Sequence, residues 1–371
     1  MKILFFRVFI LCIILFPIWN TVSAQSTTLV KTLEQNFEVK PHVNLDLVNK
    51  YGDIIINGWE RNFLEVKIKL TSYGKTDSDT KKLMDKVEFD FNVADDHVLI
   101  ETIIDRNKGL FSDFLNSIGD YSKSLLNKNE LDIDFEIWLP ASASLYIQNK
   151  YGDIVITDVN GKITVDQSHG NFKSNNINNL ARISVNYGNI RINSFKTGSI
   201  SIKGGDLELQ RADNVNINSK QSQLFLKNIN ALTMESTGDR VRVSDINAMK
   251  GSSSFSKFDI YRLSGSCQLD QSYGELNLHS VLPGFSTIDL KGKSTDYSII
   301  LPAKQSVKLN IIAREDRVSL AESIKDLDKI YVDEKAKTIH ITGNYGKIEP
   351  THSILKISST TGEVSVNFEL E

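Results

Sequence analysis

The stretch Ser144-Leu145-Tyr146-Ile147-Gln148-Asn149-Lys150-Tyr151-Gly152-Asp153-Ile154-Val155-Ile156 decides the fold class. Apolar and polar side chains alternate on both sides of a Tyr-Gly-Asp turn, and this period of two is that of a β-strand. The phrase Asn-Lys-Tyr-Gly-Asp-Ile also occurs at residues 49–54, and shorter copies begin at Tyr187 and Tyr273. A phrase that recurs in this way predicts a repeat protein built from strands and turns.

The spacing of the phrase is kept even in repeats where its residues differ. The first apolar residue after each turn recurs every 17 or 18 residues, in the series Ile154, Phe172, Ile190, Leu207, Leu224, Val241, Phe258 and Leu276. Four more apolar columns accompany it, beginning at Ile156, Val159, Ile163 and Val165. One coil cannot bury its inner face alone, but stacked coils can. The sequence therefore predicts an all-β fold, a parallel β-solenoid (β-helix) with coils of about 18 residues, eight of them between about 151 and 290.

Outside the coils the pattern is less regular, and it predicts four segments. These are a signal peptide at 1–24, an irregular β-rich region at 25–145 with an insertion at 105–129, the coils at 146–302, and C-terminal strands that form a cap at 303–371. Within the second segment we expect a helix from Asp77 to Lys86 with Asp79 as its cap, and a hairpin of strands 87–93 and 97–103. In the cap we expect strands near 306–312, 338–342 and 353–358.

The first residues are typical of a secretory signal. Lys2 and Arg7 are basic, the run 8–16 is almost wholly apolar, and Val22-Ser23-Ala24 is a small-residue cleavage site. We expect cleavage before Gln25 and export to the periplasm, the cell surface or the medium; an uncleaved anchor is the alternative. Loss of the two basic residues would bring the formal net charge from −3 to −5, which gives no reason to expect nucleic acid or anionic membrane as a partner. We expect no membrane span in the mature chain.

The Tyr-Gly-Asp phrase admits a structural and a functional interpretation. Glycine suits a turn that needs a positive φ or a close approach of two coils, and Asp and Asn are good turn residues whose amides can form ladders. The alternative is a calcium- or glycan-binding stripe. The column after the glycines changes sign at Arg240 and Lys257, which is unfavourable for a repeated cation site. We therefore predict a structural turn motif, made of Tyr51, Gly52, Asp53, Tyr151, Gly152, Asp153, Tyr187, Gly188, Tyr273 and Gly274.

An enzyme was considered because β-helices also carry polysaccharide-cleaving sites, which need clustered carboxylates. Asp153 and Asp206 share a column but lie three coils apart, and Asp132 and Asp134 are interpreted as a solvated strand face. The stretch Asp166-Gln167-Ser168-His169 contains the Ser, His and Asp of a hydrolase catalytic triad, but adjacent residues on one turn seldom form such a triad. Cys267 falls in an apolar column and is expected in the core. No metal-ligand spacing or cofactor fingerprint is visible, so we expect no catalytic residue, metal or cofactor.

Three segments together resemble a known family: residues 51–59, the Asp-Phe-Glu-Ile-Trp-Leu-Pro strand at 134–140, and residues 144–156. With the signal and the shorter coils they are similar to exported bacterial β-strand-repeat domains of unknown function, of Bacteroidetes type, that are labelled putative adhesins. The resemblance covers roughly residues 37–300. It implies a solenoid-like envelope protein and brings no catalytic residues. The early copy at 51–56 departs from a continuous solenoid, since about 80 residues separate it from the next coil.

The function that follows is a non-catalytic binding module of the cell envelope, or a secreted one. Its expected partner is a glycan or an envelope or surface protein. A polysaccharide-active β-helix enzyme is one alternative. Another is a structural envelope protein that assembles through its terminal β-edges, in which case deletion of residues 353–371 should abolish assembly. Exposed aromatics such as Tyr146, Tyr261 and Phe225 on one face would favour a glycan ligand.

Overall fold

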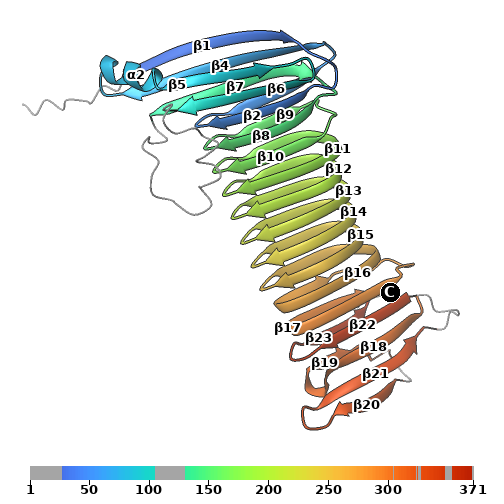
Figure 1. The fold of residues 1–371 in the computed structure, drawn as a ribbon. Coiled ribbons are helices and arrows are strands. Elements are labelled where there is room, and N and C mark those ends of the chain that lie inside the picture. The colour runs from blue at the N-terminus through green and yellow to red at the C-terminus, as the bar shows by residue number, and fades with distance from the viewer. Residues whose placement is uncertain are drawn as a thin grey trace, which may run out of the picture.

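The computed structural model describes residues 27–104, 130–303, 305–322, 324, 327–346 and 353–369. It is an all-β protein in which most strands pair in parallel and stack into an elongated column (Figure 1). One α-helix lies near the N-terminal end of this column. The predicted signal peptide at 1–24 and the predicted insertion at 105–129 lie outside the described residues.

The middle of the column consists of long strands, each of which contributes to both sides of the stack. They are β11 (Phe172–Asn186), β12 (Ile190–Lys203), β13 (Asp206–Lys220), β14 (Gln223–Thr237), β15 (Arg240–Ser254) and β16 (Lys257–Leu278). From β12 to β15 each strand pairs in parallel with the next at an offset of 17 residues, for example Ile190 with Leu207 and Lys203 with Lys220. Bulges between β11 and β12 and between β15 and β16 change the offset between 17 and 18.

This register places the predicted apolar columns in the core. Every member of the five columns is buried except Gly251. The outward partners between them are mostly polar or charged, with Val155 and Phe225 as exceptions, so one side of each strand is buried and the other faces solvent. Burial of apolar surface at about 25 cal/mol per Å² is the main favourable contribution of such a stack, and no disulfide supports it, because Cys267 is a free, buried thiol.

The stack has two faces, each with its own strand order. On the first face β3 (Ile54–Trp59) and β9 (Ile154–Thr157) lead to the first halves of the long strands. On the second face β2 (Asn44–Lys50), β8 (Ser144–Lys150) and β10 (Ile163–Ser168) lead to the second halves. A tight corner joins the end of each second-face strand to the next first-face strand.

The early copy of the phrase is part of this stack, contrary to the expectation from the sequence. Strand β2 pairs with β8, and β3 pairs with β9, in parallel and at an offset of 100 residues. The intervening strands do not separate the two copies, because they lie on the far sides of β2 and β3. Residues 44–59 are therefore the first repeat of the column, and distance along the chain was the wrong criterion.

Further strands cover the N-terminal end of both faces, and the outer pairings there are antiparallel. On the first face β3 pairs in parallel with β7 (Leu131–Pro140), while β7 with β4 (Phe63–Gly74) and β4 with β1 (Thr27–Glu38) are antiparallel. On the second face β2 pairs in parallel with β6 (His97–Ile104), which forms the predicted hairpin with β5 (Val87–Val93). The predicted helix is α2 (Asp77–Met84), and its cap is Thr76, not Asp79: the Thr76 hydroxyl accepts the Asp79 N–H at 3.2 Å.

The C-terminal end is closed in a way the sequence does not show. Strands β22 (Ser353–Ser359) and β23 (Val364–Phe368) pair with β17 (Thr287–Leu301) in parallel. Beyond them lie β18 (Val307–Arg314), β19 (Val318–Leu320), β20 (Asp328–Asp333) and β21 (Thr338–Tyr345), with a 3₁₀ turn at Glu315–Arg317. The last two strands are thus internal to the sheet. The expectation that residues 353–371 carry the free edge is wrong for the described part of that segment, since the outer strands at this end are β20, which pairs with β21, and β19, which pairs with β23.

Candidate functional site: the stacked corner

The corner between the two faces has an unusual backbone at one position in every repeat. We call this column the corner stripe; its members are Tyr51, Tyr151, His169, Tyr187, Gly204, Gln221, Gly238, Phe255, Tyr273 and Ser294. All ten have φ between +52° and +69°. A positive φ was one of two reasons considered for the glycine of the phrase, and the preceding residue adopts it instead. A left-handed residue turns the chain sharply, and eight of the ten are not glycine.

The glycines that follow the stripe serve the other purpose considered, close approach of neighbouring repeats. A Cβ added to Gly152 would overlap the carbonyl oxygen of Gly52, and one added to Gly188 would overlap that of Gly170. Gly52 and Gly274 face the carbonyls of Ile133 and Ser256 in the same way. No side chain fits between these backbones, which accounts for the glycine half of the motif.

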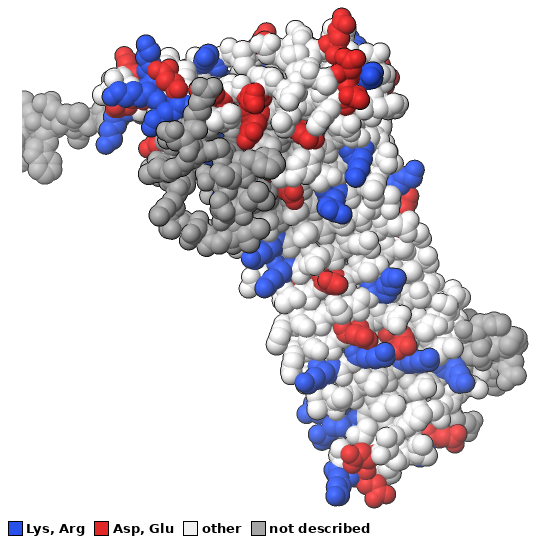
Figure 2. Space-filling view, in the orientation of Figure 1, with Lys and Arg blue, Asp and Glu red and all other residues white. Residues whose placement is uncertain are grey.

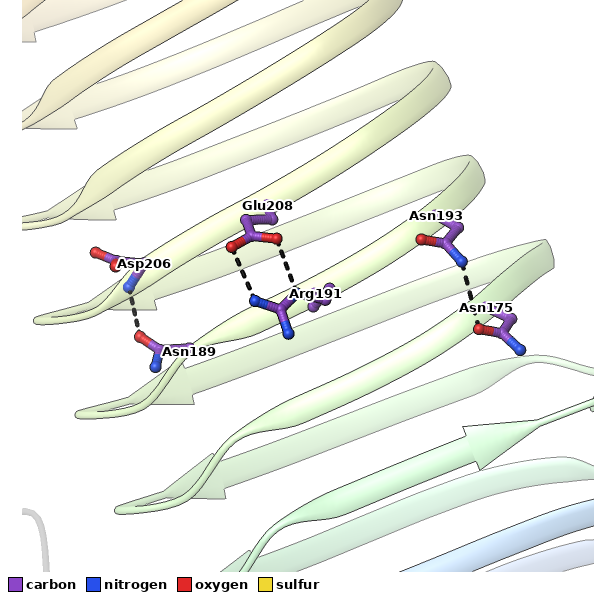
Figure 3. A network of polar contacts seen from close by, with 6 residues as sticks. All are labelled: Asn175, Asn189, Arg191, Asn193, Asp206 and Glu208. Carbon is purple, nitrogen blue, oxygen red and sulfur yellow. Dashed lines mark hydrogen bonds and ion pairs between the residues drawn. The ribbon is translucent and has the colours of Figure 1, made fainter.

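The Asp and Asn residues after the glycines form a ladder along the stack. The Asp53 carboxylate accepts the N–H of Asp153 at 2.7 Å, and the Asp153 carboxylate accepts the N–H of Asn171 at 2.8 Å. The ladder continues through Asn189 to Asp206, where the distance is 2.9 Å (Figure 3). Each side chain thereby satisfies a backbone donor of the next repeat.

Two further contacts between repeats accompany the ladder on the same side of the column. Arg191 and Glu208 form a two-point ion pair at 2.8 and 2.9 Å, and Asn193 donates to Asn175 at 3.4 Å (Figure 3). Pairing with Arg191 lowers the pKa of the Glu208 carboxyl. Both side chains are exposed, so the pair contributes little to stability.

Aromatic rings of the corner stripe stack on one another. The ring centroids are 5.4 Å apart for Tyr51 and Tyr151, 5.1 Å for Tyr151 and His169, and 5.2 Å for His169 and Tyr187, with interplanar angles of 8 to 14°. Phe255 and Tyr273 stack at 5.1 Å. His169 and Phe255 were missed by the search for the Tyr-Gly-Asp phrase. The signal that could have found them is their place one residue before the glycine column.

Lysine side chains lie over several of these rings. The Nζ of Lys50 is 4.7 Å from the ring centre of Tyr51, and that of Lys150 is 5.1 Å from Tyr151. Lys203 lies over Tyr187 at 5.6 Å. The stripe is therefore aromatic and cationic together, and the exposed rings retain 44% of their surface at Tyr187 and 45% at Tyr273.

The stripe is interrupted between Tyr187 and Phe255. Gly204, Gln221 and Gly238 occupy the three intervening positions. Gln221 and Gly238 line a surface hollow of about 870 Å³ that continues past Phe255 and Tyr273. Beneath this hollow is a buried carboxylate, that of Asp239. It accepts hydrogen bonds from the hydroxyls of Ser219 and Ser236 and from the N–H groups of Ser222 and Thr237, at 2.5 to 3.0 Å.

The aromatic residues that we named as glycan indicators do not share one face. Tyr146 is partly buried on β8 of the second face, where burial raises the pKa of its hydroxyl. Tyr261 stacks on His279, and Phe225 lies under Arg242. Three aromatic side chains of the corner stripe, Tyr187, Phe255 and Tyr273, are exposed, and other exposed aromatics such as Phe63 and Tyr331 lie elsewhere.

The residues considered for catalysis have other partners. Asp134 accepts the N–H of Asp53 at 3.0 Å and so begins the ladder, while burial, with Asp134 and Asp53 nearby, raises the pKa of Asp132. His169 is stacked between two tyrosines. Burial raises the pKa of the Cys267 thiol to about 12. Within the described ranges no group of three or more His, Cys, Asp or Glu residues is placed to hold a metal ion.

Charges on the view in Figure 2 are of both signs. Lysine and arginine side chains alternate with aspartate and glutamate along the column, and uncharged residues separate them. Ion pairs between neighbouring repeats account for part of this mixing, as in Lys257 with Glu275 and Arg262 with Asp245. A mixed surface of this kind does not favour a polyanion as the ligand. In the described part of the chain, no helix has the length and apolar character needed to cross a membrane.

Comparisons with known proteins return no matching family model and no significant match among curated proteins. Solved structures that match include a putative cell adhesion protein from Clostridium sporogenes (12% identity, 91% of this chain and 100% of the other, TM-score 0.19). A putative adhesin from Bacteroides fragilis shares 13% identity over 91% of this chain and 97% of its own, with a TM-score of 0.25. A putative lipid binding protein from Parabacteroides distasonis shares 13% over 72% and 96%, with a TM-score of 0.31. The chain is thus similar to proteins named as putative adhesins of Bacteroidetes and Clostridium, the group that its sequence resembles.

Proposed function

We propose that this protein is an exported, non-catalytic binding module of the cell envelope or of the medium, in which a β-solenoid presents the corner stripe to a glycan or a surface protein. In this proposal residues 1–24 are the signal peptide, 25–145 and 303–371 close the two ends, and 146–302 carry most of the binding surface. The motif of ten Tyr, Gly and Asp residues builds the corner, and its exposed rings at Tyr187 and Tyr273 are also part of the surface offered to the ligand.

One observation carries the proposal: three aromatic rings of the corner stripe, those of Tyr187, Phe255 and Tyr273, are exposed along one edge of the column. A stacked pair such as Phe255 and Tyr273 keeps large apolar surfaces in water, which costs free energy unless a ligand covers them. Aromatic faces bordered by lysine and amide groups suit ligands that have both apolar and polar sides, as sugars and extended peptides do. The parallel ladder beneath holds the rings at fixed spacing, so little side-chain entropy is lost on binding.

The test is a binding assay on the purified protein. Peptidoglycan sacculi, mannan, chitin and whole bacterial cells are incubated with it, and the fraction removed from solution is measured. A double variant, Tyr187→Ala with Tyr273→Ala, should lose most of this binding, while the control Tyr261→Ala, an exposed aromatic outside the stripe, should keep it. Equal binding by the double variant would overturn the proposal, as would release of sugar products by the unmodified protein.

A second candidate function, assembly through a terminal β-edge, is favoured by strand β20. All six of its residues are exposed, including Ile330, Tyr331 and Val332 at 55 to 60%, and among the described strands it pairs with β21 alone. Such an edge can receive a strand of another chain. Sedimentation at increasing concentration tests this: the protein should assemble, and Ile330→Lys should keep it monomeric. A protein that stays monomeric at all concentrations rules the candidate out.

A further inference from the structure

We propose that the interruption of the corner stripe is a binding site for an uncharged pyranose unit of a glycan, which stacks on Phe255. We call it the corner slot and define it by Gln221, Gln223, Gly238, Arg240, Phe255 and Lys257. The inference rests on the proposed function and goes further, because it names one site on the stripe and the class of ligand that it takes.

Phe255 supplies an open aromatic face. One side of its ring stacks on Tyr273, and the other side looks toward Gly238, which has no side chain. A Cβ added to Gly238 would meet only the Gln221 side chain, at 3.8 Å, so the space beyond is open. Phe255 is 66% exposed, the largest fraction of any large apolar side chain in the described residues. A flat apolar partner that fits above Gly238 would cover this face.

The backbone does not require glycine at the floor of the slot. Tyr, His, Gln, Phe and Ser adopt the same positive φ at equivalent positions of the stripe. A tyrosine at 238 could therefore continue the stack, as Tyr187 and Tyr273 do in their own repeats. What glycine provides at 238 is empty space. Phe255 lies four repeats from Tyr187, about 19 Å at the usual strand spacing.

The polar wall of the slot arises from a change in the ladder. In the preceding repeats an Asp or Asn side chain accepts the N–H of the next repeat, but here the backbone accepts it: Gln223 N–H donates to Gly205 O at 3.1 Å, and Arg240 N–H to Ser222 O at 3.1 Å. The Gln223 side chain is therefore not used as the acceptor for the Arg240 N–H, and the Arg240 guanidinium has only donors and cannot continue the ladder. Neither makes a side-chain hydrogen bond or ion pair with another described residue, and both line the hollow.

The charges of the slot favour an uncharged, hydroxyl-rich ligand. Lys257 is paired with Glu275 at 2.9 Å, and the Asp239 carboxylate is buried and saturated by four donors. Two cations and three carboxylates line the hollow, so it has no excess of positive charge to hold an acidic group. Amide, guanidinium and carboxylate groups offer both donors and acceptors, which hydroxyl groups can use in pairs. The hollow, about 870 Å³, is within the range of ligand pockets.

The experiment measures binding of defined oligosaccharides by titration calorimetry. The neutral probes are maltoheptaose, cellohexaose and mannohexaose, and the acidic probe is trigalacturonate. We expect at least one neutral probe to bind. Phe255→Ala should weaken it about tenfold, and Gly238→Tyr should abolish binding by filling the slot. Phe225→Ala, an exposed aromatic outside the slot, should leave the affinity unchanged. A urea midpoint for Gly238→Tyr at or above that of the unmodified protein shows that the variant is folded.

Each other outcome is decisive. If no neutral probe binds at millimolar concentration, if only trigalacturonate binds, or if Gly238→Tyr binds as well as the unmodified protein, the slot is not a pyranose site. Where Tyr187→Ala with Tyr273→Ala loses binding to polysaccharide but the slot variants do not, the slot inference falls and the proposed function stands. Where the double variant also binds normally, both fall.

Discussion

Replacement of Gly188 by alanine tests the account of the corner most directly. Its added Cβ would meet the O, C and N atoms of Gly170, all of them backbone atoms that cannot rotate away. Gly188 does not have a positive φ, so no strain arises from its own conformation. The matched control is Ser222→Ala, which alters the same column in a repeat that already holds a side chain there.

The magnitude follows from the contacts. The two repeats would have to part by about 1.5 Å before the contact reached van der Waals separation. That movement strains the His169 N–H to Asn186 O bond (2.9 Å) and the Asn189 N–H to Asn171 side-chain bond (3.0 Å), each worth about 1 kcal/mol. Overpacking adds about 1 to 3 kcal/mol, and the lower entropy of the unfolded alanine chain returns about 0.4 to 1 kcal/mol. We expect a net loss of about 3 kcal/mol in the free energy of unfolding.

The control should lose only the bond from the Ser222 hydroxyl to Lys220 O, at 2.9 Å, or about 1 kcal/mol. Urea unfolding followed by circular dichroism gives both values if the m-values agree. Because repeats can unfold separately, amide hydrogen exchange over residues 168–190 should show faster opening in Gly188→Ala alone. If Gly188→Ala is as stable as Ser222→Ala, or more stable than the unmodified protein, close backbone approach does not explain the glycines.

Three further predictions concern the ladder, the second face and the core. Asp153→Ala removes the acceptor for the Asn171 N–H and should lower the free energy of unfolding, measured with urea, by about 1 to 2 kcal/mol. Asp153→Asn keeps an acceptor and should lower it by less than half as much. Equal losses in the two variants would contradict the ladder. Burial raises the pKa of Asp166, so the native protein binds that proton more tightly than the unfolded chain, and stability falls as pH rises from the ordinary carboxyl pKa to the raised one. Asp166→Asn should therefore raise the urea midpoint at neutral pH and leave it unchanged in acid below the ordinary pKa; a gain at both would refute this cause. Burial holds the Cys267 thiol, with its pKa of about 12, in the protonated form. Ellman's reagent should therefore modify Cys267 only after denaturation, as mapped by mass spectrometry. Reaction in the native protein would contradict the placement of Cys267 in the core.

The sequence by itself determined the repeat. Alternation of apolar and polar residues is a local property, because neighbouring side chains of a strand point to opposite sides. A column such as Ile154, Phe172 and Ile190 keeps its spacing only if each member occupies the same place in successive repeats, and the register pairs them in that way. The hairpin at 87–104 was equally local, and it was predicted almost to its ends.

The candidate site could be predicted only in part. The glycine and Asp/Asn columns were visible as columns, but Phe255 and His169 belong to the stripe through position and not through residue type. Gly238 matters because it leaves no side chain beside the Phe255 ring, and a sequence pattern does not indicate such an empty space. The sequence left open whether the glycine serves a positive φ or a close approach, and only the packing of neighbouring repeats decides for the close approach.

Tertiary structure alone decided how the two ends join the column. Strand β2 meets β8 across 100 residues, and β22 lies between β17 and β18. Period and composition do not encode such pairings, because any exposed strand edge of compatible register can accept them. The chain therefore specifies locally that it forms strands and corners, whereas the order of strands at each end, and with it the free edge at β20 and the slot beside Phe255, is fixed only when distant segments pack together.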